Sequence, residues 1–292
     1  MEIHQLEYVI ALSKYMKFSL AADEISVSQS TLSDQIKKLE NELGVQLFIR
    51  STRKVQLTSA GEDFLAYAKR IISEIENARS CMFEYSNLMK GKIKIGALST
   101  ITYLGITSVI ANFQKDYPGF EMEIFEENSD TLLKKLSTSE IDVAFISYPY
   151  IANFEFDFYP LINDRLVLLV SSTHPLAERK EVSIEELSKE KFLMIQSSTG
   201  LQNSLVQLCR DAGFEPNIIL KSSHVETIKG LIEEGIGITL FANRIAASIS
   251  NEKTAIIELK EPVKRVTGLA LSKNNRLLST KTFKDYVLGR KI

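Results

Sequence analysis

The sequence predicts an α/β protein in three parts: a mainly helical winged helix-turn-helix, a long linker helix and a two-lobed α/β domain. Short helical patterns come first and end in a basic hairpin. A strict apolar repeat then runs from residue 64 to residue 89. From residue 91 onward, strand-like and helical segments alternate, which is typical of parallel sheets covered by helices. We place the parts at 1–58, 59–90 and 91–292, with lobe I at about 91–161 and 267–292 and lobe II at about 162–266.

The composition is that of an ordinary globular protein. The chain has 292 residues, of which 45% are hydrophobic and 25% charged, so it can bury a sizeable core. Its net charge of −2 excludes a broad polycationic coat, and any contact with nucleic acid must come from a local patch. The sequence has no apolar run of membrane-spanning length, and its two cysteines follow no disulfide or metal-binding spacing. We therefore expect a cytoplasmic protein that does not bind membranes.

The first part follows a helix-turn-helix pattern. Ser19 is predicted to cap a short helix that contains Ala21 and Ala22, whose small side chains allow close packing. Ser28 is predicted to cap the next helix, and Gly44 suits a left-handed cap at its end. This second helix has one apolar stripe at 4, 3, 4 spacing, formed by Leu32, Ile36, Leu39 and Leu43.

The opposite face of the second helix is polar, and a basic hairpin follows it. No acidic residue stands between Glu42 and Glu62, although three basic ones do. Small polar groups near a helix N-terminus can read base edges in the major groove, and a basic wing can contact phosphates or the minor groove. Periodicity alone gives a plain solvated face about equal weight, but the order of helix-turn-helix, wing and long helix favours DNA. We expect double-stranded DNA to contact Ser28, Gln29, Ser30, Ser33, Asp34, Lys37, Arg50, Arg53 and Lys54.

The long helix of the second part is predicted to associate with another copy of itself. Ser59 and Glu62 have the spacing of a capping box at its start. A narrow 3.5-residue apolar period suits a coiled-coil seam, and packing against its own domain is the alternative. The seam residues are Phe64, Ala68, Ile71, Ile75, Ala78, Met82, Tyr85 and Met89.

Hydroxyl-rich loops in both lobes indicate a site for a small-molecule effector. Each loop follows a strand and precedes a helix, where hydroxyls and backbone N–H groups can bind anions. Simple helix capping is the alternative for any one of these residues. The loops favour a small anion such as a carboxylate, with neutral metabolites as the other class. The predicted effector-binding residues are Ser99, Thr100, Asn128, Ser147, Gln196, Ser197, Ser198, Thr199 and His224.

The sequence offers no catalytic or metal-binding motif. Its three histidines are scattered, and the short Gly235-x-Gly237 motif is a weak signal on its own. Cys209 is interpreted as a buried thiol rather than a redox sensor. We therefore expect no catalytic residue, no metal, no cofactor and no enzymatic activity.

The chain resembles the LysR-type transcriptional regulators. "GKIKIGA" is similar to the first strand of the family's effector domain, and "IKGLIEEGIGITLF" to a helix–Gly-x-Gly–strand segment. In the N-terminal part the resemblance rests on Ala21-Ala22, Val27-Ser28-Gln29, Leu32-Ser33, Leu39-Glu40, Leu43-Gly44, Leu47-Phe48, Leu57-Thr58 and Ala60-Gly61.

This resemblance implies a sequence-specific regulator of transcription, controlled by an effector bound between two lobes like those of type 2 periplasmic binding proteins. It also implies homodimers that assemble into a homotetramer, and it makes RNA polymerase a further candidate partner. The sequence departs from the family at Asp34, often a basic residue there, and at Ser30 and Ala242, where proline is common. Asp34 either accepts from a cytosine amino group or pairs with a lysine of its own helix.

Two other classes of protein remain as alternatives. One is a cytosolic small-molecule-binding module without DNA function, in which the basic wing has no purpose. The other is an enzyme, which needs a convergent set of catalytic groups that the sequence lacks. Salt-dependent DNA binding and turnover assays distinguish these classes.

Overall fold

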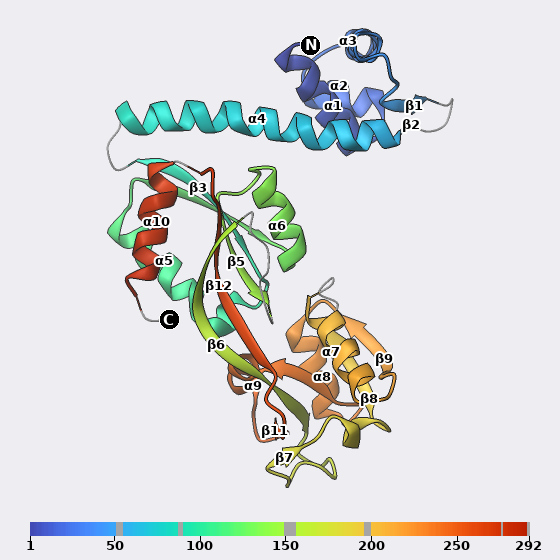
Figure 1. Cartoon of the computed structure of the whole chain (residues 1–292), viewed down its shortest axis with the longest axis vertical. Helices are drawn as coiled ribbons and strands as arrows, with labels where there is room; N and C mark the ends of the chain where they lie inside the picture. Colours follow the sequence, from blue (N-terminus) through green and yellow to red (C-terminus); the bar gives the residue numbers. More distant parts are fainter. Residues whose placement is uncertain (51–54, 87–89, 149–155, 196–199, 276, 291–292) are drawn as a thin grey trace. The chain divides into compact units, whose positions relative to one another are not determined.

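The computed structural model describes residues 1–50, 55–86, 90–148, 156–195, 200–275 and 277–290, which form two compact units (Figure 1). The first unit comprises Met1–Ser86 with Ser137–Glu140, and the second comprises Asn87–Leu136 with Ile141–Ile292. The fold is α/β, as predicted, with a helix-turn-helix first and a strand-rich region after it.

The first unit is a winged helix-turn-helix followed by a long helix. Its small core joins the helices to the hairpin, because Leu32, Ile36 and Leu39 pack with Ala21 and residues of the other elements. The elements are α1 (Ile3–Tyr15), α2 (Phe18–Glu24), α3 (Gln29–Leu43), β1 (Phe48–Arg50), β2 (Val55–Leu57) and α4 (Ser59–Ser86).

Helix ends in this unit agree only in part with the sequence prediction. Ser28 caps α3, since its Oγ accepts a hydrogen bond from the Thr31 backbone N–H at 3.0 Å, and Gly44 ends α3 with φ of 72°. The prediction for Ser19 was wrong, because α2 starts at Phe18 and its N-cap position is Lys17, two residues earlier than predicted. Ser59 lies inside α4, and Thr58 Oγ1 accepts from the Gly61 backbone N–H at 2.9 Å instead.

Gly61 allows the start of α4 to approach the backbone of Leu47, just before β1. A Cβ at this position would lie 2.1 Å from the backbone oxygen of Leu47, which no side chain tolerates. The close approach is fixed by Thr58, whose backbone N–H donates to the Leu47 carbonyl at 3.0 Å. Gly61 of the Ala60-Gly61 pair therefore serves the packing of α4 against the hairpin.

The second unit is built on one eight-stranded sheet in the order β4-β3-β5-β12-β6-β11-β7, with β10 paired to β6, and on a two-stranded sheet of β8 and β9. Its strands are β3 (Gly91–Ala97), β4 (Phe120–Glu126), β5 (Val143–Tyr148), β6 (Phe156–Ser171), β7 (Glu181–Val182), β8 (Lys191–Ile195), β9 (Asn217–Ser222), β10 (Thr239–Ala242), β11 (Thr254–Leu259) and β12 (Lys264–Ser272). Its helices are η1 (Ile101–Leu104), α5 (Ile106–Asp116), α6 (Ser129–Ser137), η2 (Glu185–Leu187), α7 (Gly200–Asp211), α8 (Val225–Glu233), α9 (Asn243–Ile249) and α10 (Leu278–Leu288).

Helices cover both faces of the sheet, because its strands are apolar on alternate faces. In β5, Phe145 joins the cluster that contains α5 and α10, whereas Ile146 joins the cluster that contains α6 (Figure 1). In β6, Leu169 likewise faces the cluster with α8 and α9, and Leu168 faces the cluster with α7. The second unit thus has one lobe at each end of the long strands β6 and β12.

The two long strands run antiparallel, which differs from the parallel sheets predicted. Strands β3, β4 and β5 are parallel, as are β8 and β9, but β12 pairs antiparallel with both β5 and β6. In this region the sequence predicts a strand only at "RLVLLVSS", residues 165–172, because the first half of β6 is partly exposed and lacks a clean alternation. Strand β11 and helix α9 were also not predicted.

Candidate DNA-binding surface and effector cavity

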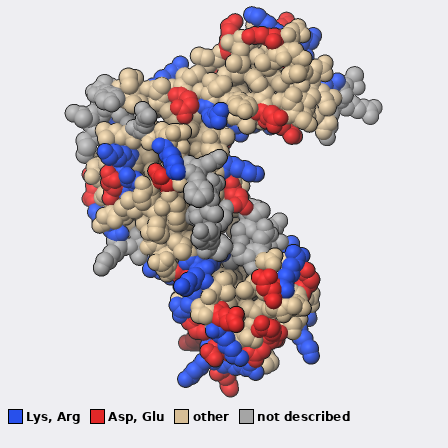
Figure 2. Space-filling view, viewed as in Figure 1, with Lys and Arg blue, Asp and Glu red and all other residues tan. Residues whose placement is uncertain are grey.

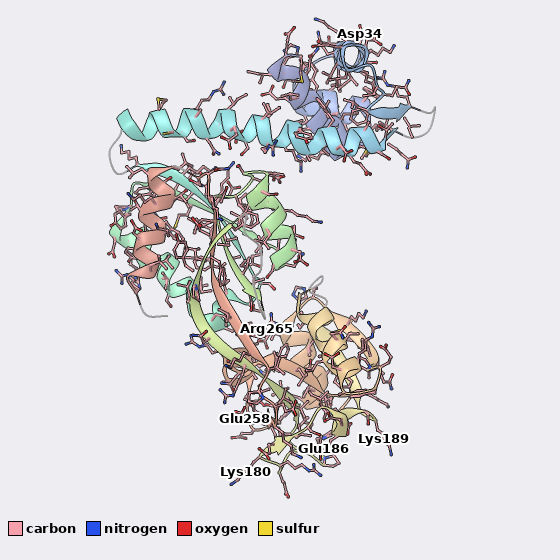
Figure 3. The ribbon with its side chains drawn as sticks, in the orientation of Figure 1. Asp34, Lys180, Glu186, Lys189, Glu258 and Arg265 are labelled. Carbon is pink, nitrogen blue, oxygen red and sulfur yellow. The ribbon has the colours of Figure 1, made fainter. Side chains whose placement is uncertain are left out.

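The predicted DNA-reading face of α3 is exposed. Gln29, Ser30, Asp34 and Lys37 are exposed, and Ser33 is partly buried at the flank. Figure 3 shows Asp34 on α3 pointing away from the helix axis into open space. Basic and acidic side chains are mixed on the visible surface around α3 (Figure 2), which matches the nearly balanced charge of residues 1–91.

The hydroxyl groups at the start of α3 form a small cluster. Ser28 Oγ lies 2.8 Å from both Ser30 Oγ and Thr31 Oγ1, and it also accepts from the Thr31 backbone N–H. The side chain of Ser28 is therefore held by the cap. Gln29, the first residue of α3, is exposed beside it. This cluster presents hydroxyls and backbone N–H groups where a phosphate or a base edge can be bound.

The wing forms as predicted, but Arg50 has a role within the fold. Its Nη2 donates to Glu40 Oε2 at 2.6 Å, and its guanidinium lies 5.4 Å from the centre of the Phe18 ring. Glu40 is buried, and its other oxygen accepts from the backbone N–H groups of Leu47 and Phe48 at 2.9 and 3.1 Å. Glu40 thus joins α3, the wing and Arg50 through charge-assisted hydrogen bonds. The DNA contact assigned to Arg50 stays a prediction, and Arg53 and Lys54 lie outside the described residues.

Helix α4 leaves part of its apolar seam exposed. Its first seam residues pack inward, since Ala68 is buried and Phe64 packs against the core of the helix-turn-helix. Farther along, Ile71 is 37% exposed and Met82 is 62% exposed. A large apolar side chain that is mostly exposed on a heptad seam is typical of a helix that pairs with another helix. The side chains of Tyr85 and Met89 lie outside the part that the structure describes.

A cavity of about 450 Å³ in the second unit collects five of the predicted effector-binding residues. Ser99 and Thr100 follow β3, Asn128 follows β4, Ser147 belongs to β5, and His224 precedes α8. The carboxyl ends of β3, β4 and β5 meet at one edge of the sheet, which is where ligands bind in open α/β sheets. We call this space the effector cavity; its remaining lining residues are Leu98, Leu104, Glu126, Glu127, Ser129, Ile195, Ser223, Phe241, Ala242, Ile245, Arg265 and Thr267.

The other four predicted residues, Gln196, Ser197, Ser198 and Thr199, lie outside the described residues. Helix capping, the alternative given above for these residues, applies to Asn128. Its Oδ1 accepts from the Thr131 backbone N–H at 2.9 Å and so caps α6. Ser129 Oγ and Ser147 exchange hydrogen bonds at 3.2 Å, which ties the start of α6 to β5.

Arg265 is a basic residue that lines the effector cavity and was not predicted from the sequence. It lies near the start of β12, beside β6 (Figure 3), and only 7% of it is exposed. Its Nη2 donates to Ser147 Oγ at 3.2 Å. Burial lowers the pKa of the Arg265 guanidinium, and the neighbouring carboxylate of Asp164 opposes that shift.

A sequence signal for Arg265 did exist in the alternation of β12. Arg265, Thr267, Leu269 and Leu271 share one face of the strand, and the last two are buried in the sheet core. From the sequence alone, the strand-like segment in this region is "VTGLALS", residues 266–272, which leaves Arg265 just outside it. Extending the alternation by one position towards the N-terminus would have placed the guanidinium of Arg265 on the buried face of the strand.

The remaining motifs have structural explanations. Burial raises the pKa of the Cys209 thiol to about 11, and its side chain, which projects from α7, is fully buried in the core. A Cβ at Gly237 would lie 2.4 Å from the Lys191 backbone oxygen, so Gly237 serves close strand packing. Within the described residues no three His, Cys, Asp or Glu side chains gather as a metal site would require, and no described helix is long and apolar enough to cross a membrane.

Comparison with known proteins gives two family matches that together span most of the chain. Residues 3–62 match the "Bacterial regulatory helix-turn-helix protein, lysR family", and residues 86–291 match the "LysR substrate binding domain". The transcriptional dual regulator GltC of Bacillus subtilis is 31% identical over 291 residues, covering 99% of this chain and 97% of its own length.

Two further relatives agree with these matches. A hydrogen peroxide-inducible genes activator of Dickeya chrysanthemi is 32% identical over 240 residues, covering 82% of this chain and 78% of its own. The structure of a full-length OxyR variant from Pseudomonas aeruginosa has the same fold, with a TM-score of 0.70 at 24% identity over 98% of this chain and 94% of that one. The chain with this helix-turn-helix and this two-lobed domain therefore belongs to the LysR family of DNA-binding transcriptional regulators, which carry a C-terminal effector-binding domain.

Proposed function

We propose that a small-molecule effector bound in the effector cavity controls how this regulator binds its DNA. The observation that carries the proposal is the lining of the cavity, which takes residues from both lobes. Ser99 and Asn128 belong to the lobe of β3 and β4, whereas His224 and Phe241 belong to the lobe of α8 and β10. A ligand that contacts both lobes favours one lobe closure over another.

Lobe closure is proposed to reach the DNA through the assembly. The exposed seam of α4 supports pairing of two copies, and two such dimers form the homotetramer that we expect. Effector binding then changes how the dimers pack and hence the spacing and bend between DNA half-sites. Such coupling is typically worth about 1–3 kcal/mol, which changes promoter occupancy several-fold.

The finer expectations from the sequence belong to the same proposal. The regulator acts in the cytoplasm, carries no enzymatic activity, and contacts RNA polymerase at its promoters. We place the boundaries between lobe I and lobe II at about residues 161 and 267. The helix-turn-helix match at residues 3–62 disfavours the alternative of a binding module without DNA function.

The experiment is fluorescence anisotropy of the purified protein with the DNA upstream of its own gene. A scrambled duplex of equal length is the control, and both are titrated at two salt concentrations. We expect tighter binding to the upstream duplex and weaker binding at the higher salt. Equal binding to the two duplexes contradicts recognition of that upstream site.

Neighbouring lysines of α3 give a matched pair of variants for the proposed DNA surface. Lys37 is exposed on the predicted reading face, whereas Lys38 is turned about 100° around the helix, and its Nζ lies 3.6 Å from Glu2 Oε1. We expect Lys37→Ala to weaken binding to both duplexes and to reduce the salt slope by about 1. Lys38→Ala removes the same charge away from the DNA and should leave both quantities closer to those of the wild type.

A further inference from the structure

The side chain of Arg265 is incompletely satisfied inside the effector cavity. Its Nη2 donates to Ser147 Oγ, but its Nη1 is buried and has no hydrogen-bond partner among the described residues. A buried guanidinium N–H without a partner has lost its water and gained nothing in return, which costs free energy. Arginine stays protonated in proteins, so the group cannot avoid this cost by losing its charge.

The nearest acidic group is engaged elsewhere. Asp164 stands opposite Arg265 in the pairing of β6 with β12. Its Oδ1 accepts from the Arg165 backbone N–H at 2.8 Å, and its Oδ2 accepts from the Arg244 backbone N–H at 3.1 Å. Asp164 thus lowers the electrostatic cost of the buried cation, while Arg265 Nη1 still lacks an acceptor in the described structure.

The surroundings of Arg265 define the size and polarity of a suitable ligand. Hydroxyl groups of Ser99, Thr100 and Thr267 line the same cavity. Its apolar part is formed by Leu98, Leu104, Ile195, Phe241 and Ile245. A cavity of about 450 Å³ with this lining fits a small molecule that has one polar end and an apolar body.

The other charged groups of the cavity limit the ligand to a single negative charge. Glu126 and Glu127 lie at the end of β4, are exposed, and also line the cavity. Their carboxylates repel a second anionic group on a ligand, so dicarboxylates and phosphate esters are disfavoured. His224 is exposed and stands before α8.

We propose that the effector is a small monocarboxylate with an apolar body, whose carboxylate accepts from Arg265 Nη1 beside Ser147. This inference rests on the proposed function and names the ligand class of the same cavity. The carboxylate supplies an acceptor to Arg265 Nη1, which has none among the described residues, and the pair is charge-assisted and partly desolvated. Binding therefore satisfies a buried N–H group for which the described part of the chain offers no partner.

The first test uses the wild-type chain and needs no variant. Its thermal unfolding is measured with 4-methylpentanoate, hexanoate and phenylacetate, each beside its neutral amide, and with adipate and inorganic phosphate. We expect the monocarboxylates to raise Tm and their amides, adipate and phosphate to raise it less, because only binding to the native state stabilises it. Equal shifts for acids and amides, larger shifts for adipate or phosphate, or no shift with any monocarboxylate overturn the proposal.

The second test replaces the cation by an apolar side chain of similar length. We expect Arg265→Met to weaken monocarboxylate binding about 10- to 100-fold, as loss of a hydrogen bond to a charged group does. We also expect Tm of unliganded Arg265→Met to equal or exceed that of the wild type, since the variant removes a buried unsatisfied charge. A marked fall in Tm would assign Arg265 a structural role instead.

Two further variants serve as controls for the second test. Arg265→Lys retains the charge and should retain part of the monocarboxylate affinity that Arg265→Met loses. Arg210→Met makes the same replacement at an exposed arginine on α7 that pairs with Glu215, and it should leave the monocarboxylate shift unchanged. Equal losses in both methionine variants contradict a specific role for Arg265.

Anisotropy with the upstream duplex separates this inference from the proposed function. If monocarboxylates leave Tm and DNA binding unchanged but a neutral metabolite alters both, the ligand class is wrong and the proposed function stands. If the wild type shows no preference for the upstream duplex under any ligand, the proposed function fails at that site independently of Arg265.

Discussion

Individual charged residues of the DNA-binding part divide between surface and fold. Asp34 is exposed on α3, and among the described residues it forms no ion pair with Lys37 or Lys38, so it is not engaged as the helix-pairing alternative required. Glu40 and Arg50 have the opposite character, since each is held by hydrogen bonds within the domain. The role of each charge follows from its partners in the folded domain.

Replacing Asp34 with alanine should tighten binding to random DNA. The acid faces the side on which we propose that phosphates lie, so it opposes non-specific binding. We expect a two- to fivefold gain at low salt, about the size of one exposed charge interaction, and a smaller gain at high salt. Anisotropy with the scrambled duplex measures it, and unchanged or weaker random-sequence binding would contradict the prediction.

Replacing Glu40 with alanine should destabilise the winged domain. The variant leaves the backbone N–H groups of Leu47 and Phe48 without their acceptor and Arg50 without its counter-ion. The expected loss is about 2–4 kcal/mol in the free energy of unfolding, measured by denaturant titration. The control is Glu42→Ala, an exposed carboxylate that pairs with the N-terminal amine and should cost much less.

At the scale of elements, α4 shows how one helix serves two surfaces. Its first turns complete the core of the helix-turn-helix, and its later seam residues are exposed. The sequence repeat is continuous across both regions because core packing and helix pairing use the same apolar periodicity.

The exposed part of the seam gives a test of pairing. Ile71→Glu places a charge on the seam at a residue that is already 37% exposed, so folding of the domain should survive. We expect the dimer Kd to rise at least about tenfold, because the charge would be buried between helices. Sedimentation equilibrium measures it, and Ala66→Glu on the opposite face is the control that should leave the Kd unchanged.

In the second lobe, Glu186 connects η2 to the segment before it and to Lys260. Its carboxylate accepts from the Ser183 backbone N–H at 2.9 Å, from Arg179, and from Lys260 Nζ at 3.2 Å. The Ser183 N–H and these two cations lower the pKa of Glu186 to about 2. Figure 3 shows Glu186 near the end of this lobe, on η2.

Glu186 should therefore contribute to stability in a pH-dependent way. Its folded pKa lies below the ordinary value of 4.5, so its contribution is present above about pH 4.5 and is lost as the pH falls towards 2. We expect the Tm difference between wild type and Glu186→Gln to be small, since the group is exposed, and to shrink over that range. Thermal melts at several pH values measure it, and a difference that grows on acidification would contradict the assignment.

At the scale of the whole molecule, likeness to peroxide-responsive relatives raises the question of redox control. Cys209 is fully buried in the core of the second lobe, and its raised pKa of about 11 keeps it a thiol at neutral pH. The thiolate is the form that reacts with peroxide, so Cys209 is poorly suited to sensing it.

We therefore expect DNA binding of the whole protein not to depend on oxidation of Cys209. Brief treatment with hydrogen peroxide should affect the affinity of wild type and Cys209→Ala for the upstream duplex equally, and a thiol reagent should label native Cys209 slowly. Anisotropy and mass spectrometry measure these outcomes. A peroxide response lost only in the alanine variant would establish Cys209 as a sensor.

The sequence by itself determined the class of each region. Helical and strand periodicities follow from local geometry, so the apolar stripe of α3, the repeat of α4 and the alternating strands were predicted without knowledge of distant contacts. The Ser28 cap is likewise local, because its partner lies three residues away.

Only the tertiary structure decided which polar groups meet. Arg265 and Ser147 are 118 positions apart in the chain, and no period relates them, yet they share one cavity. Likewise, Arg50, which the sequence predicts to contact DNA, donates to Glu40 within the fold, a partner that no short stretch of sequence indicates. Charges depend on their neighbours in space, and the long-range strand pairing that sets those neighbours is not encoded in any short stretch of sequence.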